Sequence, residues 1–312
     1  MKILLLGAKG QLGHALRAPL AALGEVLPAT RDGRFDGDLH GVSADLADRT
    51  ALGRALDAAR ADIIVNAAAY TAVDRAEDEP ALADRINHLA LAEIGDWAAR
   101  HQALVVHYST DYVFDGSARR AWHENDATAP LGVYGRSKLD GEIALRASGA
   151  RHLILRTAWV YSARGHNFLR TMLRLGRERD ELRVVDDQIG TPTPAHWLAT
   201  ATTNLLRRLA AMNEADRMQA LGTYHLTASS HCSWHAFASA IVGQAATAGL
   251  IARAPRVLAI STADYPTRAE RPAWSVLDTT RLKLVFGIQL PGWEHGLREV
   301  IDELVHMNGE TT

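Results

Sequence analysis

The stretch KILLLGAKGQLG, from Lys2 to Gly13, decides the fold of this chain. Its first six residues form a short apolar run that ends in glycine, which is typical of a buried strand. The glycines Gly7, Gly10 and Gly13 have the spacing G-x-x-G-x-x-G and open a helical pattern. Glycine permits a tight turn and a close backbone approach to a pyrophosphate, which the N–H groups of the helix N-terminus can bind. This order of strand, glycine loop and helix predicts a dinucleotide-binding unit.

Apolar runs and helical patterns alternate through the first half of the chain. The runs at 62–69, 103–109 and 152–161 are short and lack alternation, as expected for parallel strands that are covered on both faces. Between them, periodic apolar patterns predict helices over 48–60 and 84–101. This order predicts an α/β fold of the Rossmann type, with a doubly wound parallel sheet whose ligands bind at the carboxyl ends of the strands.

The two predicted helices carry local signals of their own. Asp48 stands where an N-cap is expected before the first helix. In the second helix, Ile86, Leu89, Ile94 and Trp97 recur at spacings that place them near one face. That face is expected to pack into the core.

The second half of the chain has a looser rhythm. Segments rich in Pro, Gly, Trp and Arg predict loops over a site, around a smaller mixed α/β lobe. We expect an NAD(P)-binding Rossmann domain over 1–156 and a lobe over 157–312 that mainly binds the substrate. The run at 222–229 is expected to form one more strand, so the segment at about 193–226 is predicted to rejoin the first domain.

Composition restricts the class of protein. The 312 residues carry a net charge of -2, which gives no reason to expect nucleic acid or an anionic membrane as a partner. No apolar run reaches the roughly 20 residues of a membrane-spanning helix. Cys232 is the single cysteine, so an intramolecular disulfide is excluded and a reducing compartment is expected. These features favour a soluble cytoplasmic protein.

The end of the second predicted strand bears on the choice of coenzyme. An acid there would bind the ribose hydroxyls of NADH, whereas an arginine accommodates the 2′-phosphate of NADPH. The chain has Thr30, Arg31 and Asp32 at this place. Arg31 favours NADPH, and Asp32 leaves NADH open as an alternative. Asp45, in the next loop, is expected either to reach the adenine or to cap the following helix.

Polar side chains follow the strand predicted at 103–109. Ser109, Thr110, Asp111 and Tyr112 stand at its carboxyl end, where a ligand is expected. A hydroxyl at Thr110 is suited to hold the oxygen of a carbonyl substrate.

Tyr134 and Lys138 lie four residues apart at the head of the next helical pattern, which puts a phenol and an ammonium on one helix face. A neighbouring ammonium stabilises phenolate, so we expect it to lower the pKa of Tyr134 toward working pH. Together with Thr110, this pair predicts a proton donor for a carbonyl that receives hydride from a nicotinamide.

These motifs resemble those of a known family. The glycine loop, NAAAYTAVD, STDYVF and YGRSK are similar to motifs of the extended short-chain dehydrogenases/reductases. With RTAWVY, DDQIGTPT and YPTRAERPAWS added, nearly the whole chain resembles the dTDP-4-dehydrorhamnose reductases within that superfamily. The resemblance implies reduction of the 4-keto group of dTDP-4-dehydro-6-deoxy-L-mannose with NADPH or NADH, to give dTDP-β-L-rhamnose.

The resemblance also implies roles for particular residues. Tyr134 is implied as the proton donor, Lys138 as the group that holds the nicotinamide ribose, and Thr110 as their catalytic partner. Besides Tyr134 and Lys138, the expected coenzyme contacts lie in the glycine loop and at strand ends, namely Gly7, Gly10, Gln11, Leu12, Gly13, Arg31, Asp45, Leu46, Ala69, Tyr70, Thr71 and Tyr108. The expected substrate contacts are Val73, Thr110, Asp111, Tyr112, Trp159, Gln188, Arg268 and Arg271. Arginine suits a pyrophosphate because its guanidinium binds it in a bidentate way.

Two positions depart from the family pattern. Thr30 stands where related reductases can carry an acid, which weakens a preference for NADH. Some relatives have a carboxylate at the position of Ala15 that helps bind magnesium between two subunits, and alanine cannot bind a metal. We therefore expect no metal at the site. A homodimer stays open as an assembly, but not one of the magnesium-linked kind.

Other functions stay open at this point. Another sugar-nucleotide reductase, a dehydratase or an epimerase would share the fold. Dehydratases of this kind place an Asp–Glu pair after the active threonine, whereas this chain has Asp111 and Tyr112. A non-catalytic nucleotide-binding regulatory subunit would share the fold too, but it would have no need for Thr110, Tyr134 and Lys138 together.

The remaining histidines have simpler explanations. Those between residues 225 and 235 lie near Cys232, but the chain lacks the paired cysteines that zinc sites use. His107 and His152 lie within apolar strands, which is typical of hydrogen-bonded residues that line a core or a cavity.

Overall fold

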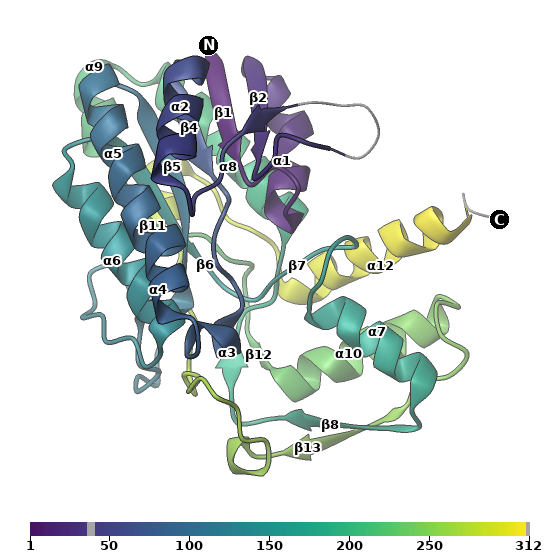
Figure 1. The fold of residues 1–312 in the computed structure, drawn as a ribbon. Coiled ribbons are helices and arrows are strands. Elements are labelled where there is room, and N and C mark those ends of the chain that lie inside the picture. The colour runs from purple at the N-terminus through teal and green to yellow at the C-terminus, as the bar shows by residue number, and fades with distance from the viewer. Residues whose placement is uncertain (36–40, 310–312) are drawn as a thin grey trace.

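The computed structural model describes residues 1–35 and 41–309, and its centre is one parallel sheet (Figure 1). Within the described residues, seven strands lie in the order β11-β6-β5-β4-β1-β2-β3, and each neighbouring pair is parallel. Their bounds are β1 Lys2–Leu6, β2 Glu25–Thr30, β3 Val42–Ser43, β4 Ile63–Asn66, β5 Leu104–Thr110, β6 Arg151–Thr157 and β11 Gly222–His225. The predicted α/β fold with a doubly wound parallel sheet is confirmed.

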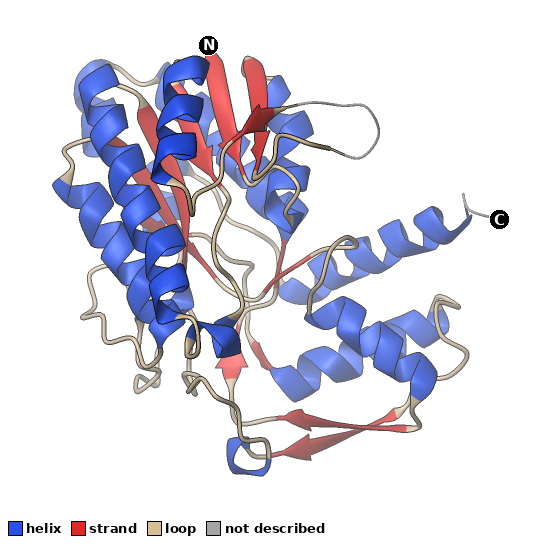
Figure 2. Ribbon diagram, viewed as in Figure 1, coloured by secondary structure: helices blue, strands red, loops and turns tan. Residues whose placement is uncertain are grey.

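Helices cover both faces of this sheet, and Figure 2 distinguishes the two kinds of element by colour. On one face lie α1 (Gln11–Ala21), α8 (Ala195–Ala211) and α11 (Thr280–Phe286). On the other face lie α2 (Arg49–Ala59), α5 (Ala90–His101) and α6 (Val133–Ala147). Each layer of helices shares a separate hydrophobic core with the sheet.

The apolar run of β1 follows from these two layers. Ile3 and Leu5 pack into the core that contains α1 and α8. Leu4 and Leu6 point to the opposite face and pack with α2 and α5. All four side chains are fully buried. A strand that is covered on both faces needs an uninterrupted apolar sequence, as the pattern predicts.

The first predicted helix begins as expected. Asp48 is the N-cap of α2, and its carboxylate accepts hydrogen bonds from the N–H groups of Thr50 and Ala51.

The helix predicted over 84–101 is built in three parts. α4 (Pro80–Asp84) leads into a π-helical turn, η1 (Arg85–Leu89), and α5 follows directly. A π-helical turn inserts a residue and rotates the side chains on either side of it relative to one another. Trp97 is buried as predicted, but Leu89 is 40% exposed. The prediction of one continuous apolar face was therefore wrong at Leu89.

The run predicted as one strand over 152–161 is divided into β6 and β7 (Val160–Tyr161). Trp159 has φ of +46°, in the left-handed region, and the chain leaves the main sheet there. β7 pairs with β10 (Thr193–Pro194) instead. The prediction is corrected because an apolar run does not reveal a turn of the backbone within it.

A smaller lobe lies below the sheet in Figure 1 and has its own core. It contains α7 (Phe168–Glu178), α10 (Trp234–Thr247), α12 (Trp293–Gly309) and the parallel pair β8 (Glu181–Val185) and β13 (Arg256–Ile260). The short elements elsewhere are α3 (Val73–Ala76), α9 (Glu214–Gln219), β9 (Ile189–Gly190), β12 (Cys232–Ser233) and the 3-10 turns η2 (Asp111–Val113) and η3 (Thr262–Asp264). In the described ranges, no helix combines the length and the apolar character needed to cross a membrane.

The main sheet also receives elements from the second half of the chain. β11 pairs with β6, with Tyr224 opposite Leu155. α8 packs along α1, and Leu205 of α8 lies in the same core as Leu16 of α1. The core under the glycine loop is therefore assembled from both halves of the chain.

Candidate active site

The glycine loop between β1 and α1 is folded tightly. Gly7 has φ of +76°, and a Cβ there would lie 2.7 Å from the backbone nitrogen of Ala68. A Cβ at Gly13 would lie 2.1 Å from the carbonyl oxygen of Gly7. Gly10 is the N-cap of α1, so the unpaired N–H groups of the first helical turn lie at the loop. Because these glycines have no side chains, the loop packs closely against the N-terminus of α1. This arrangement suits a phosphate.

A cavity of about 510 Å³ opens beside this loop. It follows the carboxyl ends of the central strands and ends at α6, as expected for a ligand site in a doubly wound sheet. The coenzyme residues predicted from the sequence that line it are Gly7, Gly10, Gln11, Leu12, Arg31, Asp45, Leu46, Ala69, Thr71, Tyr108, Tyr134 and Lys138.

Two predicted coenzyme contacts do not line the cavity. Gly13 is buried under the loop and supports its packing. Tyr70 turns its side chain away and donates its phenolic hydrogen to Glu79 at 2.6 Å. The backbone N–H of Tyr70 is bound to Oδ1 of Asn87 at 2.8 Å. Both residues therefore contribute packing and hydrogen bonds around the cavity and do not line it.

A loop from the second half of the chain also lines the cavity, through Gly165 and His166. Gln11 holds this loop, because its Nε2 donates to the carbonyl oxygen of His166 at 3.3 Å and its Oε1 accepts from Asn167 at 2.7 Å. Gly165 has φ of +70°. The sequence reasoning missed these residues, and the glycine next to a polar run was the one available signal.

The cavity has Arg31 at its rim, with its side chain 80% exposed. Its Nε lies 4.0 Å from a carboxylate oxygen of Asp45. Asp32 instead accepts hydrogen bonds within its own turn, from the N–H of Arg34 at 3.1 Å and the hydroxyl of Thr30 at 3.3 Å. The bond from Arg34 is the main reason that the pKa of Asp32 lies below its usual value. Arg31 is thus better placed than Asp32 to meet a ribose substituent.

Tyr134 enters the inner end of the cavity from the first turn of α6. Burial raises the pKa of its phenol to about 12, and the neighbouring hydroxyl of Thr110 opposes part of this increase. The expected lowering of this pKa was wrong, because burial of the phenol dominates. A phenol with this pKa stays protonated at neutral pH.

Lys138 reaches inward from the next turn of α6 and is 2% exposed. Its Nζ donates to the carbonyl oxygen of Tyr108 at 2.7 Å and lies 3.1 Å from Nε2 of His107. Burial lowers the pKa of Lys138 to about 8, and Glu142, one turn further along α6, opposes this decrease. Tyr134 and Lys138 share one cavity, as their spacing predicts, but the amine is directed toward β5.

Thr110 and Asp111 form the carboxyl end of β5 and the start of η2. The hydroxyl of Thr110 accepts a hydrogen bond from the N–H of Tyr112 at 3.1 Å and donates to Oδ1 of Asp111 at 3.0 Å. Asp111 is 2% exposed, and burial raises its pKa to about 7. Its Oδ2 has no hydrogen-bond partner within the described residues. Asp111 lines neither cavity beside Tyr134, so a ligand reaches this oxygen only if the surrounding side chains move.

A second cavity of about 10 Å³ lies beyond Tyr134 and is lined in part by Val73 and Tyr112. The rings of Tyr112 and Tyr134 meet edge to face, with centroids 5.9 Å apart. These side chains enclose the space next to the phenol.

The segment with Arg268 and Arg271 is tied to the chain around α3. Arg271 makes two hydrogen bonds to the carboxylate of Asp74, at 2.7 and 3.1 Å. The backbone N–H of Ala269 donates to the same carboxylate at 3.2 Å. Arg268 forms an ion pair with Asp78. Both arginines predicted for the nucleotide are thus held by acids in this structure.

Trp159 was expected at the sugar pocket and Gln188 at the nucleotide end, and both make contacts within the protein. Trp159 stacks on Trp234, with ring centroids 3.4 Å apart. Gln188 donates to the hydroxyl of Thr262 at 3.1 Å. Neither Trp159 nor Gln188 lines the two cavities beside Tyr134.

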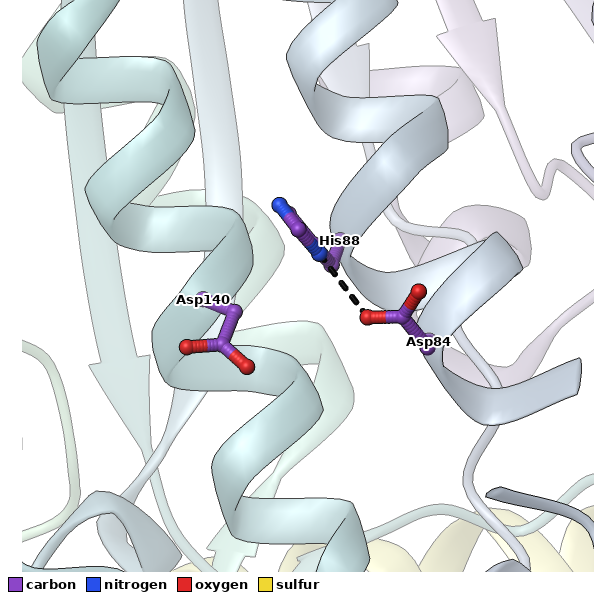
Figure 3. Close-up of side chains that lie close together, drawn as sticks. All are labelled: Asp84, His88 and Asp140. Carbon is purple, nitrogen blue, oxygen red and sulfur yellow. Dashed lines mark hydrogen bonds and ion pairs between the residues drawn. The ribbon is translucent and has the colours of Figure 1, made fainter. Parts of the chain in front are cut away.

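Asp84, His88 and Asp140 form a separate cluster between two neighbouring helical segments (Figure 3). One ligand atom from each residue lies within 4.8 Å of the other two, and Nδ1 of His88 lies 2.8 Å from Oδ1 of Asp84. None of the three lines the cavity beside the glycine loop. The cluster is therefore distinct from the candidate active site.

The residues between 225 and 235 are occupied by other contacts. Nδ1 of His225 lies 3.1 Å from the carbonyl oxygen of Asp278. Burial raises the pKa of the Cys232 thiol to about 12. Ser233 is the N-cap of α10 and accepts a hydrogen bond from the N–H of Ala236.

The cavity has the features that a nicotinamide dinucleotide requires. The glycine loop offers backbone N–H groups at a helix N-terminus, and Arg31 lies at the opposite end from Lys138. Ser109 and Thr157 also line the cavity, although their hydroxyl oxygens are buried away from it.

Known proteins resemble this chain over nearly its whole length. The family model described as RmlD substrate binding domain matches residues 1–306. A curated dTDP-4-dehydrorhamnose reductase of Escherichia coli (strain K12) is 43% identical over 304 residues, which cover 97% of this chain and 98% of that protein.

Solved structures agree with this match. A dTDP-4-dehydrorhamnose reductase from Clostridium acetobutylicum has a TM-score of 0.85 at 34% identity, covering 97% of this chain and 99% of that one. The same enzyme from Bacillus anthracis, solved in complex with NADP, has a TM-score of 0.84 at 32% identity and the same coverage. The chain therefore belongs to the RmlD substrate binding domain family, which includes the dTDP-4-dehydrorhamnose reductases.

Proposed function

We propose that this protein reduces the 4-keto group of dTDP-4-dehydro-6-deoxy-L-mannose with NAD(P)H and releases dTDP-β-L-rhamnose. The observation that carries the proposal is Tyr134, which stands at the inner end of the cavity beside the glycine loop, next to Thr110 and with Lys138 in the same cavity. The reductase from Escherichia coli, similar over its full length, supports the same substrate.

The residues around the phenol suit a reduction. When bound, the dihydronicotinamide supplies the hydride that adds to C4. Tyr134 donates its phenolic proton to the oxygen at C4 as that oxygen gains negative charge. Burial keeps this phenol protonated at neutral pH, so the acid is ready before the reaction. The Thr110 hydroxyl would donate to the same oxygen once it turns away from Asp111, and a charged Lys138 would stabilise the phenolate that remains.

The substrate contacts are proposed on the same basis. Oδ2 of Asp111 would accept a hydrogen bond from a sugar hydroxyl once the side chains that bury it move, since it has no partner within the described residues and Asp111 lines neither cavity. Val73 and Tyr112 would enclose the sugar next to Tyr134 once the cavity between them opens, because at about 10 Å³ it has room for no more than about one water molecule. Arg271 would bind the pyrophosphate once it leaves the carboxylate of Asp74.

Three further substrate contacts complete the proposal. Arg268, which pairs with Asp78, would bind the nucleotide beside Arg271. Trp159 would shape the sugar pocket and Gln188 would reach the nucleotide only if the loops around them rearrange, because neither lines the cavities next to the phenol.

The coenzyme is proposed to be NADPH, with NADH as a weaker alternative, because of Arg31. Replacing Arg31 with alanine removes the cation at the rim of the cavity. We expect the KM for NADPH to rise about tenfold, in line with the loss of one charge-assisted phosphate contact, and the KM for NADH to stay within about twofold. Initial rates with each coenzyme measure the effect.

Arg54→Ala is the matched control, because Arg54 is an exposed arginine on α2 that does not line the cavity. It should leave both KM values unchanged. An equal rise of both KM values in Arg31→Ala would mean that Arg31 does not distinguish the two coenzymes.

The function itself is tested by a coupled assay. The dTDP-4-keto-6-deoxy sugar is supplied after epimerisation, the loss of NADPH and of NADH is followed separately by absorbance, and the product sugar is identified. We expect one coenzyme consumed for each dTDP-rhamnose formed. A dehydratase or an epimerase would retain its coenzyme unchanged through the cycle, and a regulatory subunit would bind NADPH without turnover.

Assembly and location are part of the same proposal. We infer that any homodimer forms without magnesium, because Ala15 of α1 packs its methyl group against the core and offers no ligand atom. A cytoplasmic location is inferred from the substrate class and the single cysteine.

A further inference from the structure

The amine of Lys138 is buried without a carboxylate of its own. Its hydrogen-bond neighbours within the described residues are the carbonyl oxygen of Tyr108 and Nε2 of His107. Glu142 lies one turn further along α6, but its two oxygens bind Arg156 and Arg146. The state of His107 therefore bears directly on the proton of Lys138.

His107 is held on its other side by Asn66. The two residues stand opposite each other on β5 and β4, and both are almost fully buried. Nδ1 of His107 lies 3.2 Å from Nδ2 of Asn66. Oδ1 of Asn66 accepts a hydrogen bond from the backbone N–H of Ala68 at 3.1 Å.

These two contacts determine where the proton of His107 lies. A backbone N–H can only donate, so the amide oxygen of Asn66 has to face Ala68 and its NH₂ group has to face His107. Nδ1 of His107 is then an acceptor. Burial and the nearby Lys138 keep the pKa of His107 well below its usual value, so the ring is neutral. Its single proton is consequently on Nε2, which points at Nζ of Lys138.

An N–H group that points at Lys138 affects its charge. A neutral amine has a lone pair and can accept this hydrogen bond, whereas an ammonium has three N–H groups and no acceptor. Charging Lys138 in this arrangement brings two donors together. The ammonium avoids this contact between donors only if His107 changes tautomer and Asn66 turns its amide oxygen away from Ala68.

Other groups around Lys138 do not replace this effect. The titratable or charged residues near it, with the element of each, are His107 and Tyr108 of β5, Tyr134 and Glu142 of α6, Arg156 of β6 and, acting on Tyr134, Asp111 of η2. The π-helical turn contributes the neutral Asn87, which donates to Ser137 at 3.0 Å. Asp84 and His88 of the neighbouring segments lie across from Asp140 instead (Figure 3).

We propose that His107, with its tautomer fixed by Asn66, is a positioning residue. It shifts the equilibrium between the ammonium and the neutral amine of Lys138 in the reductase reaction. The inference rests on the proposed function. The Nε2–H group disfavours the ammonium, and the ammonium stabilises the phenolate of Tyr134. His107 thus limits the pH range in which Lys138 can support proton donation by Tyr134. Turnover should fall as the pH rises and Lys138 loses its proton.

Two substitutions at His107 test the proposal through the pH profile of kcat. His107→Gln offers an amide oxygen at the place of Nε2, which accepts a hydrogen bond from the ammonium. We expect the alkaline limb of the profile to move to higher pH by about 0.5–1 unit. His107→Asn reaches only the place of Nδ1, so it removes the Nε2–H group without an acceptor, and we expect a smaller shift in the same direction.

The matched control is His152→Gln on the neighbouring strand β6. Nδ1 of His152 lies 2.8 Å from the carbonyl oxygen of Ala150, and the residue does not line the cavity. Its alkaline limb should coincide with that of the parent protein. If both His107 variants lower kcat but keep the limb within about 0.2 unit of the parent, His107 has only a structural role and the proposal is overturned.

A measurement on the unmodified protein tests the proposal even if the His107 variants fail to fold. Proton–nitrogen NMR of histidine-labelled protein distinguishes the two neutral tautomers and needs no substrate. We expect the Nε2–H tautomer at His107 between pH 6 and 9, and an Nδ1–H tautomer or a charged ring would overturn the proposal. Because this measurement does not depend on turnover, failure of the tautomer and failure to reduce the keto sugar are separate results.

Discussion

Replacing Tyr134 with phenylalanine removes one hydroxyl from the inner end of the cavity. The ring and its edge-to-face contact with Tyr112 remain, so we expect Tyr134→Phe to bind NADPH within about threefold of the parent. The kcat should fall by about 100-fold or more, since a positioned acid contributes on this scale. Steady-state kinetics and a fluorescence titration of the coenzyme measure the two effects. A kcat within a few-fold of the parent would mean that another group donates the proton.

Asp111 is expected to make the stability of the protein depend on pH. Burial raises its pKa from 3.8 to about 7, so the folded state favours the protonated carboxyl. The stability that the protonated group contributes is complete below the unfolded pKa and is lost as the pH rises through the folded pKa. Asp111→Asn has no charge to bury. We expect its Tm to exceed that of the parent at pH 8 and this advantage to shrink at pH 5.

Thermal unfolding at both pH values measures the effect of Asp111. Asp302→Asn serves as the control, because Asp302 is exposed on α12. It should change the Tm little at either pH. A stability difference between Asp111→Asn and the parent that is the same at pH 5 and pH 8 would mean that Asp111 does not titrate between them.

At the scale of elements, two helical glycines are expected to respond in opposite ways to alanine. A Cβ at Gly53 in α2 meets no atom within 4 Å, so Gly53→Ala should raise the free energy of unfolding by about 0.5–1 kcal/mol through helix propensity. A Cβ at Gly13 in α1 would lie 2.1 Å from the carbonyl oxygen of Gly7. Gly13→Ala should therefore displace the loop, lowering both stability and affinity for NADPH.

Urea unfolding and coenzyme titration separate the two glycines. Gly53→Ala is the matched control for Gly13→Ala, since both place a methyl group inside a helix of the same length. If Gly13→Ala bound NADPH as tightly as Gly53→Ala, the close packing of the glycine loop would not be needed for the coenzyme.

The elements differ in how far local sequence predicts them. β1 is predictable because its apolar run reflects burial on both faces, and α2 because Asp48 caps it. The exposure of Leu89 follows from the π-helical turn at Arg85–Leu89, and no residue type in that segment predicts such a turn. The turn of the backbone at Trp159 likewise cannot be predicted from the apolar run in which it lies.

At the scale of the whole molecule, the first 156 residues are expected to be an incomplete domain. The core beneath the glycine loop includes Leu205 of α8, Tyr224 of β11 and Phe286 of α11. A fragment 1–156 would expose the apolar surface that these residues cover. We expect it to lack the cooperative thermal unfolding of the full chain, as measured by circular dichroism.

This test bears on the proposed division of the chain, in which the segment at about 193–226 belongs to the first domain. A fragment that ends at residue 228 restores α8 and β11 and should be more protected from proteolysis than 1–156, although it still lacks α11. Cooperative unfolding of 1–156 alone would contradict the division.

The sequence by itself determined the parallel sheet, the glycine loop, and the presence of a phenol and an amine on one helix face. These features depend on short-range spacing, which a single chain displays directly: a period of side chains, a run of glycines, an interval of four residues. The resemblance to the reductases named most of the residues that line the cavity beside the glycine loop, which lie where the carboxyl ends of parallel strands meet at one edge of the sheet.

Only the tertiary structure decided the chemistry of those groups. The raised pKa of Tyr134, the binding of Lys138 to β5 and the unpaired Oδ2 of Asp111 depend on which distant atoms exclude water and which accept a hydrogen bond. The loop with Gly165 and the positions of the arginines next to α3 also depend on contacts between segments far apart in the chain. Burial and partner choice are properties of the assembled core, so local spacing can name the reacting residues but cannot determine the state of their protons.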